Sequence, residues 1–234
     1  MITAASNSRI KRLVQLNQKS KLRRTEDVFL AEGVKMFLEA PREQLQEVYV
    51  SESFLEKCSC REHLEEVGYE VVSDSVFSKI SDTCTPQGVL CVLKQFHYNI
   101  EEMLRDKAPL FLLLENIQDP GNLGTMLRTG EGAGVSGIIM SRDTVDLYNP
   151  KVIRSTMGSI YRVPFYADDF AAAVHQVQQA GVSVYAAHLR GKNSYACQDY
   201  TKGTAFLIGN EGNGLREETA ELADCYIRIP MEGK

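Results

Sequence analysis

Four loops in the second half of the chain place glycines or polar residues directly after apolar runs. They are ENIQDPGNLG, AHLRGKNS, GNEGNGL and, near the end of the sequence, IPMEG. The ends of parallel strands face the same way, so these loops are expected to converge on one crevice. Gly209, Gly212 and Gly214 would let backbone N–H and C=O groups approach a flat or charged ligand closely. A glycine-rich turn alone does not specify a ligand, because a plain tight connection has the same composition.

Three other kinds of site fit the spacing poorly. GNEGNGL reads G-x-x-G-x-G, whereas a dinucleotide fingerprint needs G-x-G-x-x-G directly after a strand, and no G-x-x-x-x-G-K-[ST] phosphate loop exists. The four histidines do not cluster as metal ligands. The six cysteines show no paired C-x-x-C pattern, so we expect free thiols, several of them in the core, and no metal site.

The charge distribution favours a polyanion as partner. The chain carries a formal net charge of −5, yet Met1 to Arg24 contains seven basic residues and no acid. Phosphate binding depends on the field near the contact and not on the total charge. The alternative is an ordinary solvated helix face. The basic residues of this stretch are Arg9, Lys11, Arg12, Lys19, Lys21, Arg23 and Arg24.

The elements that must position these residues alternate between helix and strand. Apolar residues at near-helical spacing from Ile10 to Leu16 predict a first helix with one apolar and one positive side. VFLAEG, LQEVYVSES, YEVVSD and GVLCVLKQF are typical of strands, and GVKMFLEA, FLEKCSCREHLEEVG and SVFSKISD of helices. This order predicts a small α/β domain over residues 1–97 and a linker over 98–108.

A second α/β series is predicted over residues 109–234. LFLLL, GIIM, YRVPFY, VSVYAAHL, TAFLIG and CYIRIP are typical of strands. Helices are expected from about Asn122, over NPKVIRSTMGS, over DDFAAAVHQVQQAG and over LREETAELA, with Asn149 capping the second and Pro150 at its first position. The sequence has no apolar run long enough to span a membrane and no hydrophobic leader, so we expect a cytosolic protein.

Three ordered segments resemble the signature motifs of a known enzyme family. NLGTMLR, LIGNEGNGL and IRIPM, in that order, are similar to the motifs of the SpoU-type (TrmH-like) RNA ribose 2′-O-methyltransferases of the SPOUT superfamily. RSTMGSIYRVPF is similar to the segment between the first two motifs. NSRIKRLVQL and FLAEGVKMFLEA resemble the L30-like substrate-binding domain of members that modify ribosomal RNA.

The resemblance implies a fold, a cofactor and a partner. The expected fold is α/β, with a small L30-like domain followed by a SPOUT domain that has a mostly parallel sheet and a deep trefoil knot. S-adenosylmethionine would bind in the knot of a homodimer whose active site takes residues from both chains. The family continues beyond its third motif into a Ser-Leu-Asn segment and a helix that closes the knot. This sequence stops at Lys234, and we expect the natural protein to continue.

Site residues carry over by position. The resemblance implies catalytic or site-organising roles for Asn122, Arg128 and Glu211. It implies contacts to the cofactor for Ala187, Gly209, Gly212, Ile229 and Met231. RNA contacts are expected from Arg9, Lys11, Arg12, Lys21, Arg23 and Arg24, and from Arg154 and Ser155 of the intermediate segment.

Arg128 is expected to act by its charge. A ribose hydroxyl must lie in line with the methyl group, and its proton must be removed or its developing charge stabilised. A guanidinium group is a reluctant base, so we favour phosphate binding or stabilisation of the emerging alkoxide, with deprotonation as the alternative. Glu211 would anchor that guanidinium or fix the loop, and Asn122 would also cap its helix.

The sequence therefore predicts an S-adenosylmethionine-dependent methyltransferase acting on a ribose 2′-hydroxyl of structured RNA, with ribosomal RNA as the favoured substrate. Two alternatives stay open. One is an RNA-binding protein that keeps the fold without the activity, and the other is the same chemistry on transfer RNA.

Overall fold

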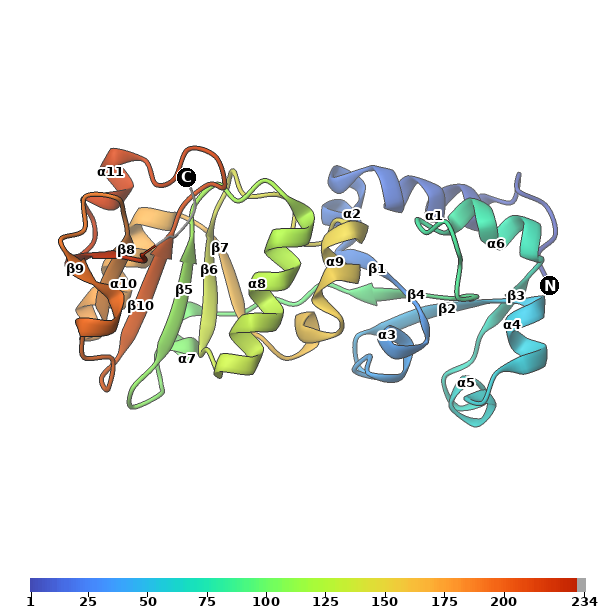
Figure 1. The fold of residues 1–234 in the computed structure, drawn as a ribbon. Coiled ribbons are helices and arrows are strands. Elements are labelled where there is room, and N and C mark those ends of the chain that lie inside the picture. Colours follow the sequence, from blue (N-terminus) through green and yellow to red (C-terminus); the bar gives the residue numbers. More distant parts are fainter. Residues whose placement is uncertain (231–234) are drawn as a thin grey trace. The chain divides into compact units, whose positions relative to one another are not determined.

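The strands form two separate sheets, one in each of two units of the chain (Figure 1). The computed structural model describes residues 1–230. The first unit comprises Met1–Phe96 together with Asp146–Tyr161, and the second comprises His97–Val145 and the chain from Arg162 onward. The predicted α/β class is confirmed in both units.

The sheet of the first unit is mixed. Its order is β1-β4-β2-β3, with β4 antiparallel to both β1 and β2, and β3 parallel to β2. Three strands, β1, β2 and β4, coincide with aliphatic runs of the sequence and are buried along most of their length, as expected for strands covered on both faces. The strands are β1 (Val28–Glu32), β2 (Leu45–Ser51), β3 (Glu70–Val72) and β4 (Val89–Lys94).

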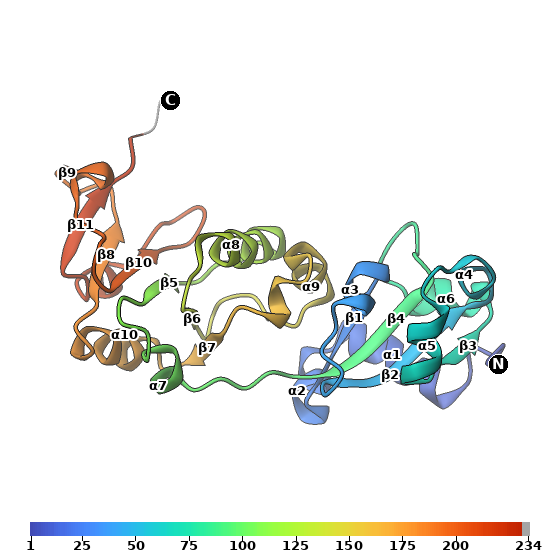
Figure 2. The same ribbon diagram turned by 90° about the horizontal axis from the view of Figure 1, so that it is seen from below.

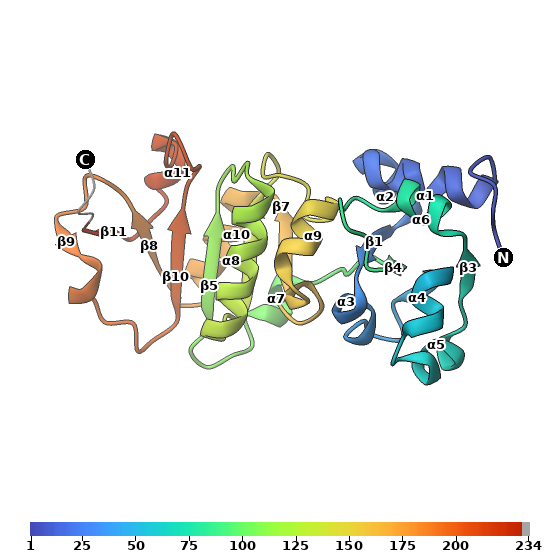
Figure 3. The same cartoon turned by 45° about the vertical axis from the view of Figure 1, so that its right-hand side comes forward.

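Helices cover both faces of this sheet (Figures 1 and 3). On one face lie α1 (Ser8–Gln18), α2 (Ser20–Glu26) and α6 (Asp74–Ile80), and the apolar side of α1 is buried there through Ile10, Leu13 and Leu16. On the other lie α3 (Val34–Leu38), α4 (Glu52–Lys57) and α5 (Arg61–Val67). The single helix predicted over residues 54–68 is wrong, because the backbone is extended at Cys58 and separates α4 from α5.

Residues 146–161 pack within the first unit although they follow the first strands of the second. They contain α9 (Pro150–Thr156), capped by Asn149 as predicted, and the 3₁₀ turn η1 (Ser159–Tyr161). The Tyr161 hydroxyl donates to the Met36 carbonyl oxygen at 3.0 Å, and the Tyr148 hydroxyl accepts from the Phe96 amide at 2.8 Å. The predicted domains, 1–97 and 109–234, are each continuous in the sequence. In the structure the first unit also includes residues 146–161, which lie within the predicted second domain.

The sheet of the second unit is parallel throughout. Its order is β7-β6-β5-β10-β8-β11-β9. The two-residue β9 was not predicted, and the strand predicted over YRVPFY begins only at Phe165 because Tyr161 belongs to η1. The strands are β5 (Leu110–Leu114), β6 (Gly137–Ser141), β7 (Phe165–Asp168), β8 (Ser183–Ala187), β9 (Asn193–Ser194), β10 (Thr204–Ile208) and β11 (Cys225–Arg228).

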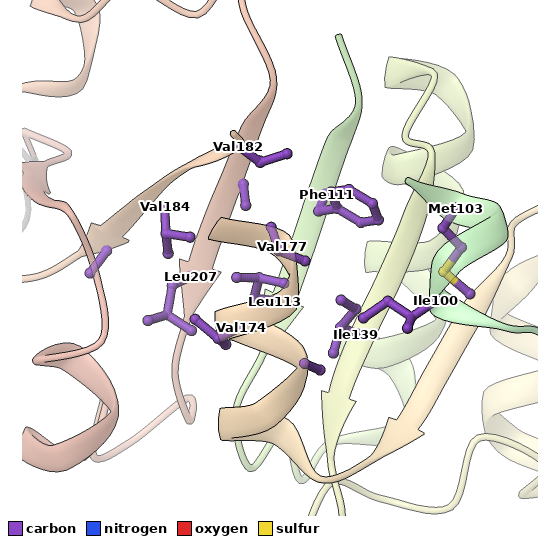
Figure 4. Packing of buried hydrophobic residues seen from close by; sticks show 13 residues of the cluster. Ile100, Met103, Phe111, Leu113, Ile139, Val174, Val177, Val182, Val184 and Leu207 are labelled. Carbon is purple, nitrogen blue, oxygen red and sulfur yellow. The ribbon is translucent and has the colours of Figure 1, made fainter. Parts of the chain in front are cut away.

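Helices lie on both faces of this sheet (Figure 2). Successive residues of β5 face opposite layers. Phe111 and Leu113 belong to the apolar cluster with Val174 and Val177 of α10 (Phe170–Gln179), as Figure 4 shows. Leu112 points the other way, toward Gly130 of α8 (Pro120–Ala133). The remaining elements are α7 (Ile100–Met103), η2 (Tyr195–Cys197) and α11 (Glu217–Ala220). None of the helices in residues 1–230 has the length and apolar character needed to cross a membrane.

Candidate active site

Two of the predicted loops lie side by side at one edge of the parallel sheet (Figure 1). β5 and β10 are neighbours, and their pairing continues one residue beyond β5, where the Glu115 amide donates to the carbonyl oxygen of Ile208, the last residue of β10, at 2.9 Å. The turn after β5 and the loop after β10 thus begin next to each other. The predicted convergence of these two loops is confirmed within the second unit.

Glu211 joins the two loops. Its carboxylate accepts hydrogen bonds from the amides of Gln118 at 3.1 Å and Asp119 at 3.0 Å, and from the Asn122 side-chain amide at 3.2 Å. Burial alone would raise the pKa of Glu211, but the donated hydrogen bonds outweigh this effect and lower the pKa to about 2. The side chain is therefore a fixed anion at neutral pH, and its charge holds the first motif against the second.

Asn122 lies in the first turn of α8 but does not cap the helix. The helix begins at Pro120, and the Asp119 carboxylate accepts from the Asn122 backbone amide at 2.8 Å as the N-cap. The predicted capping role of Asn122 is therefore wrong. Because Asp119 satisfies the helix end, the Asn122 side chain is available to contact Glu211.

Arg128 lies further along α8 and is exposed. A spacing of six residues advances the helix by about 9 Å and rotates the side chain by about 120° from the direction of Asn122. Within the described part of the chain, its guanidinium makes no hydrogen bond or ion pair. Of the two roles expected for Glu211, anchoring Arg128 is not seen in this unit, whereas fixing the loop agrees with the contacts of its carboxylate to residues 118, 119 and 122.

The positions predicted for the cofactor lie at the ends of neighbouring strands. Gly209 follows β10, Ala187 ends β8, and Ile229 follows β11, whose Ile227 is paired with Ala187. A Cβ atom at Gly209 would lie 2.2 Å from the backbone of Gly214, so only glycine permits this close approach within the loop. Met231 lies outside the described residues.

The Gly212 position differs from Gly209, because a Cβ atom there would meet only the Asn210 side-chain oxygen at 3.7 Å. That oxygen accepts hydrogen bonds from the amides of Gly212 and Asn213, each at 3.0 Å. Asn210 in turn donates to the Asn116 carbonyl oxygen at 2.8 Å. The loop is ordered by its own asparagine, and its glycine-rich tip is exposed.

The basic side chains of the first unit fall into two groups. Arg9 pairs with Glu70 at 2.7 Å, and Arg12 pairs with Glu26 and Glu47, both at 2.7 Å. The predicted cations Lys11, Lys21 and Arg24 are exposed and form no ion pair with the described residues. Lys19 is exposed as well.

The prediction that Arg23 contacts RNA is wrong. Its side chain is only 3% exposed and donates to the carbonyl oxygens of Leu16 and Asn17, while its other nitrogen pairs with Asp146 at 2.5 Å. A buried guanidinium whose two terminal nitrogens both bond to the protein cannot reach a phosphate from solvent. Arg23 therefore stabilises the first unit.

Arg154 and Ser155 both lie on α9. Arg154 pairs with Asp82 at 3.2 Å, and the Ser155 hydroxyl donates to the Lys151 carbonyl oxygen at 2.8 Å, one turn earlier in the same helix. These contacts lie within the first unit and leave their proposed role toward RNA as a prediction.

The cysteines are free, as predicted, but only Cys91 is buried. Burial raises the pKa of the Cys91 thiol, which makes it an unreactive core group. The expectation of several core cysteines is therefore wrong. Residues 1–230 contain no group of three or more metal-ligating side chains.

Sequence reasoning missed two residues of this edge, Glu115 and Arg216. Glu115 follows the aliphatic run of β5 and is 2% exposed, and it accepts from the Arg216 amide at 2.8 Å. An acid directly after a buried strand was the available signal, because such a group must find donors. Its partner 101 residues later could not be read from spacing.

Comparison with known proteins agrees with the motifs and the fold. Residues 109–234 match the SpoU rRNA Methylase family, and residues 7–91 match the MRM3-like substrate binding domain. A Bacillus subtilis 23S rRNA (guanosine(2553)-2′-O)-methyltransferase, RlmP, is 30% identical over 100% of this chain and 91% of its own length. The human mitochondrial rRNA methyltransferase 3 is 41% identical over 36% of this chain and 21% of its own length.

Solved structures of methyltransferases have a fold similar to that of this chain. The AdoMet-bound rRNA methyltransferase from Sinorhizobium meliloti has a TM-score of 0.87 and 30% identity, over 100% of this chain and 89% of that one. The SpoU methyltransferase AviRb from Streptomyces viridochromogenes has a TM-score of 0.86 at 21% identity, over 97% of this chain and 90% of that one, and shares the fold. The chain belongs to the SpoU rRNA methylase family.

Proposed function

We propose that this protein transfers a methyl group from S-adenosylmethionine to a ribose 2′-hydroxyl of ribosomal RNA. The observation that carries the proposal is the contact of Glu211 with Asn122 and the preceding amides, which unites the first two family motifs at one sheet edge. Relatives named as rRNA 2′-O-methyltransferases and an AdoMet-bound structure of the same fold support the cofactor and the substrate class.

The residues at this edge suit an adenosine and a methionine chain. Two aliphatic side chains are exposed after adjacent strands, Leu189 at 89% after β8 and Ile229 at 50% after β11, and the loop after β10 presents backbone groups around Gly212. Exposed apolar side chains beside an exposed backbone segment without bulky side chains are typical of sites for flat heterocycles. When bound, S-adenosylmethionine supplies the methyl group on an electrophilic sulfonium.

The chain's own residues would position the reacting groups. Glu211 is ionised at neutral pH and holds Asn122, so it acts on geometry and does not exchange protons there. Arg128, whose guanidinium is exposed and without an ion-pair partner in the described residues, would stabilise the developing alkoxide or bind the adjacent phosphate.

The remaining parts of the proposal concern RNA binding and assembly. The exposed cations Lys11, Lys21 and Arg24 would bind RNA phosphates, and a second copy of the chain would complete the active site. Sedimentation of the wild-type protein tests the homodimer. We also propose a cytoplasmic location, which the unpaired cysteines support.

Methyl transfer can be measured directly. Wild-type protein is incubated with ribosomal RNA and S-adenosylmethionine labelled in its methyl group, and 2′-O-methylated nucleotides are identified by their resistance to alkali. Arg128→Ala should lower kcat/KM by about 100-fold or more, because one stabilising donor at an oxyanion has an effect of this size. Arg105→Ala, another exposed arginine of the second unit, serves as the control and should retain activity.

Wild-type protein that binds S-adenosylmethionine and RNA but yields no alkali-resistant nucleotide would rule out the enzymatic function and favour a binding protein. Methylation of transfer RNA in place of ribosomal RNA would reject the proposed substrate class and keep the chemistry.

A further inference from the structure

A buried carboxylate marks the end of β5. The Glu115 side chain is 2% exposed, and it accepts hydrogen bonds from the Arg216 backbone amide at 2.8 Å and from the Thr219 hydroxyl. The Arg216 guanidinium lies 3.6 Å from the same carboxylate. A buried anion requires such donors, so Glu115 fixes Arg216, the N-cap residue of α11, which directly follows the loop 209–215.

The Arg216 guanidinium also contacts a third strand end. A second nitrogen pairs with Asp143, which follows β6 and also accepts a hydrogen bond from the Ser141 hydroxyl. The Gln118 side chain donates to the Asp143 carbonyl oxygen at 2.7 Å and to the Asn116 side-chain oxygen at 2.6 Å. The turns after β5 and β6 and the loop after β10 therefore share one polar network.

The loop 209–215 is held at both of its ends. Near its start, Asn210 and Glu211 bind the turn after β5, and beyond its end Arg216 binds Glu115 from the same turn. Between these points, Gly212, Asn213 and Gly214 are exposed. The two attachments set the path of the glycine-rich segment between them.

We propose that Glu115 and Arg216 are positioning residues for methyl transfer, which hold the loop 209–215 in the conformation that binds S-adenosylmethionine. Neither residue needs to touch the cofactor or the RNA. The inference rests on the proposed function, because it assigns a role toward the cofactor of that same site.

The chemistry of the pair supports a positioning role over a general contribution to stability. An apolar residue after β5 would fill the interior without the desolvation cost of a carboxylate, whereas a charged pair accepts only a narrow range of geometries. Arg216 is 48% exposed on its side chain and Asp143 is 40% exposed, so removing the guanidinium disturbs little packing. Loss of the pair should therefore alter the conformation of the loop 209–215 while the fold of the unit stays intact.

The test compares the affinity for the cofactor with turnover. Arg216→Ala and Glu115→Gln are prepared in the full chain, and S-adenosylmethionine binding is measured by calorimetry. We expect Kd to rise about tenfold or more, while kcat at saturating cofactor stays within about threefold of wild type and the affinity for RNA is unchanged. Arg216→Lys should recover only part of the affinity. Its ammonium group can pair with one carboxylate but cannot bridge both as a guanidinium does.

The matched control is Arg142→Ala. Arg142 also follows β6 and pairs with an aspartate, Asp168, but that ion pair does not involve the loop 209–215. This variant should bind the cofactor as wild type does. Hydrogen exchange gives a second readout, in which the amides of residues 210–216 should exchange faster in Arg216→Ala while those of β5 and β10 do not change.

The outcomes separate the inference from the proposed function. Arg216→Ala that binds S-adenosylmethionine with wild-type affinity, or that loses kcat at saturating cofactor, would overturn the positioning role while the methyltransferase stands. Failure of Glu115→Gln to fold leaves the surface variant Arg216→Ala to decide. A wild-type protein that does not bind the cofactor would remove both the function and the inference.

Discussion

Glu211 illustrates how hydrogen bonds decide what a carboxylate can do. The donors of the first motif lower its pKa from the ordinary 4.5 to about 2, so its charge is constant around neutral pH. Because the folded-state pKa is depressed, the stabilisation from Glu211 is fully present above about pH 4.5 and is lost as the pH falls toward 2. Methylation measured between about pH 6 and 9 should therefore show no titration of this group.

Glu211→Gln tests this assignment. The amides of Gln118 and Asp119 bond different oxygens of the carboxylate, so replacing one oxygen by an NH₂ group places a donor against one of these two amides. We expect turnover to fall at least about tenfold through loss of geometry. The shape of the pH–rate profile should match that of wild type. A profile that loses one limb in the variant would show that Glu211 exchanges a proton during the reaction.

The residue identities at the site were predictable, but several contacts were not. The motif order singled out Asn122, Arg128 and Glu211, and the structure joins the first and the last of these. The sequence did not show that Asp119 caps α8, because Asn122 is an equally good capping residue by type. It also placed Arg23 among exposed cations, since spacing alone cannot show that Leu16 and Asn17 offer carbonyl oxygens to it.

At the scale of elements, the loop after β10 depends on one glycine more than on the others. A Cβ atom at Gly209 would lie 2.2 Å from the Gly214 carbonyl carbon and 2.3 Å from the Leu215 nitrogen, and backbone atoms cannot move aside cheaply. Gly209→Ala should lower the free energy of unfolding by about 1–3 kcal/mol, as overpacking does, and should weaken cofactor binding. Urea denaturation and calorimetry measure the two effects.

Gly212→Ala is the matched control for this prediction. Its Cβ atom would make only an ordinary contact, so its free energy of unfolding should stay within about 0.5 kcal/mol of wild type. Equal destabilisation by both substitutions would contradict the claim that the close approach at Gly209 organises the loop.

The prediction of elements succeeded where the periodicity of apolar residues was unambiguous. It failed where the backbone leaves the helical conformation at a single residue. β5, β10 and α10 follow from aliphatic runs and a clear helical face. Residues 52–67 show helical spacing on both sides of Cys58, so nothing local predicted the extended backbone that separates α4 from α5. β9 has only two residues and exists because β11 offers a parallel edge, which is a tertiary cause.

At the scale of the whole molecule, the chain completes its first unit with a segment from far along the sequence. Asp146 lies 123 residues from Arg23, and the two form an ion pair in which the guanidinium is 3% exposed and the carboxylate 27%. Sequence order could not predict this, because residues 146–161 read as part of the second α/β series. The order of helices and strands predicted two α/β units. Which unit contains residues 146–161 depends on packing, which the order of elements does not show.

Asp146→Ala should destabilise the first unit strongly. Removing the carboxylate leaves a buried cation without its counter-ion, which costs about 3 kcal/mol. Asp82→Ala is the control, since its partner Arg154 is 46% exposed on its side chain and such pairs contribute about 1 kcal/mol or less. Thermal unfolding of both variants measures the difference, and equal shifts in Tm would contradict the structural role assigned to Arg23.

The salt dependence of RNA binding tests how an acidic chain holds a polyanion. Log affinity should fall linearly with log salt concentration, and removing a phosphate contact should reduce the slope by about 1. We expect this reduction for Lys11→Ala and Lys21→Ala, whose ammonium groups form no ion pair with the described residues. Arg9→Ala should change the slope less, because the Glu70 carboxylate already neutralises that guanidinium. A binding constant independent of salt, or a slope that Lys11→Ala and Lys21→Ala leave unchanged, would show that this basic surface does not bind RNA phosphates.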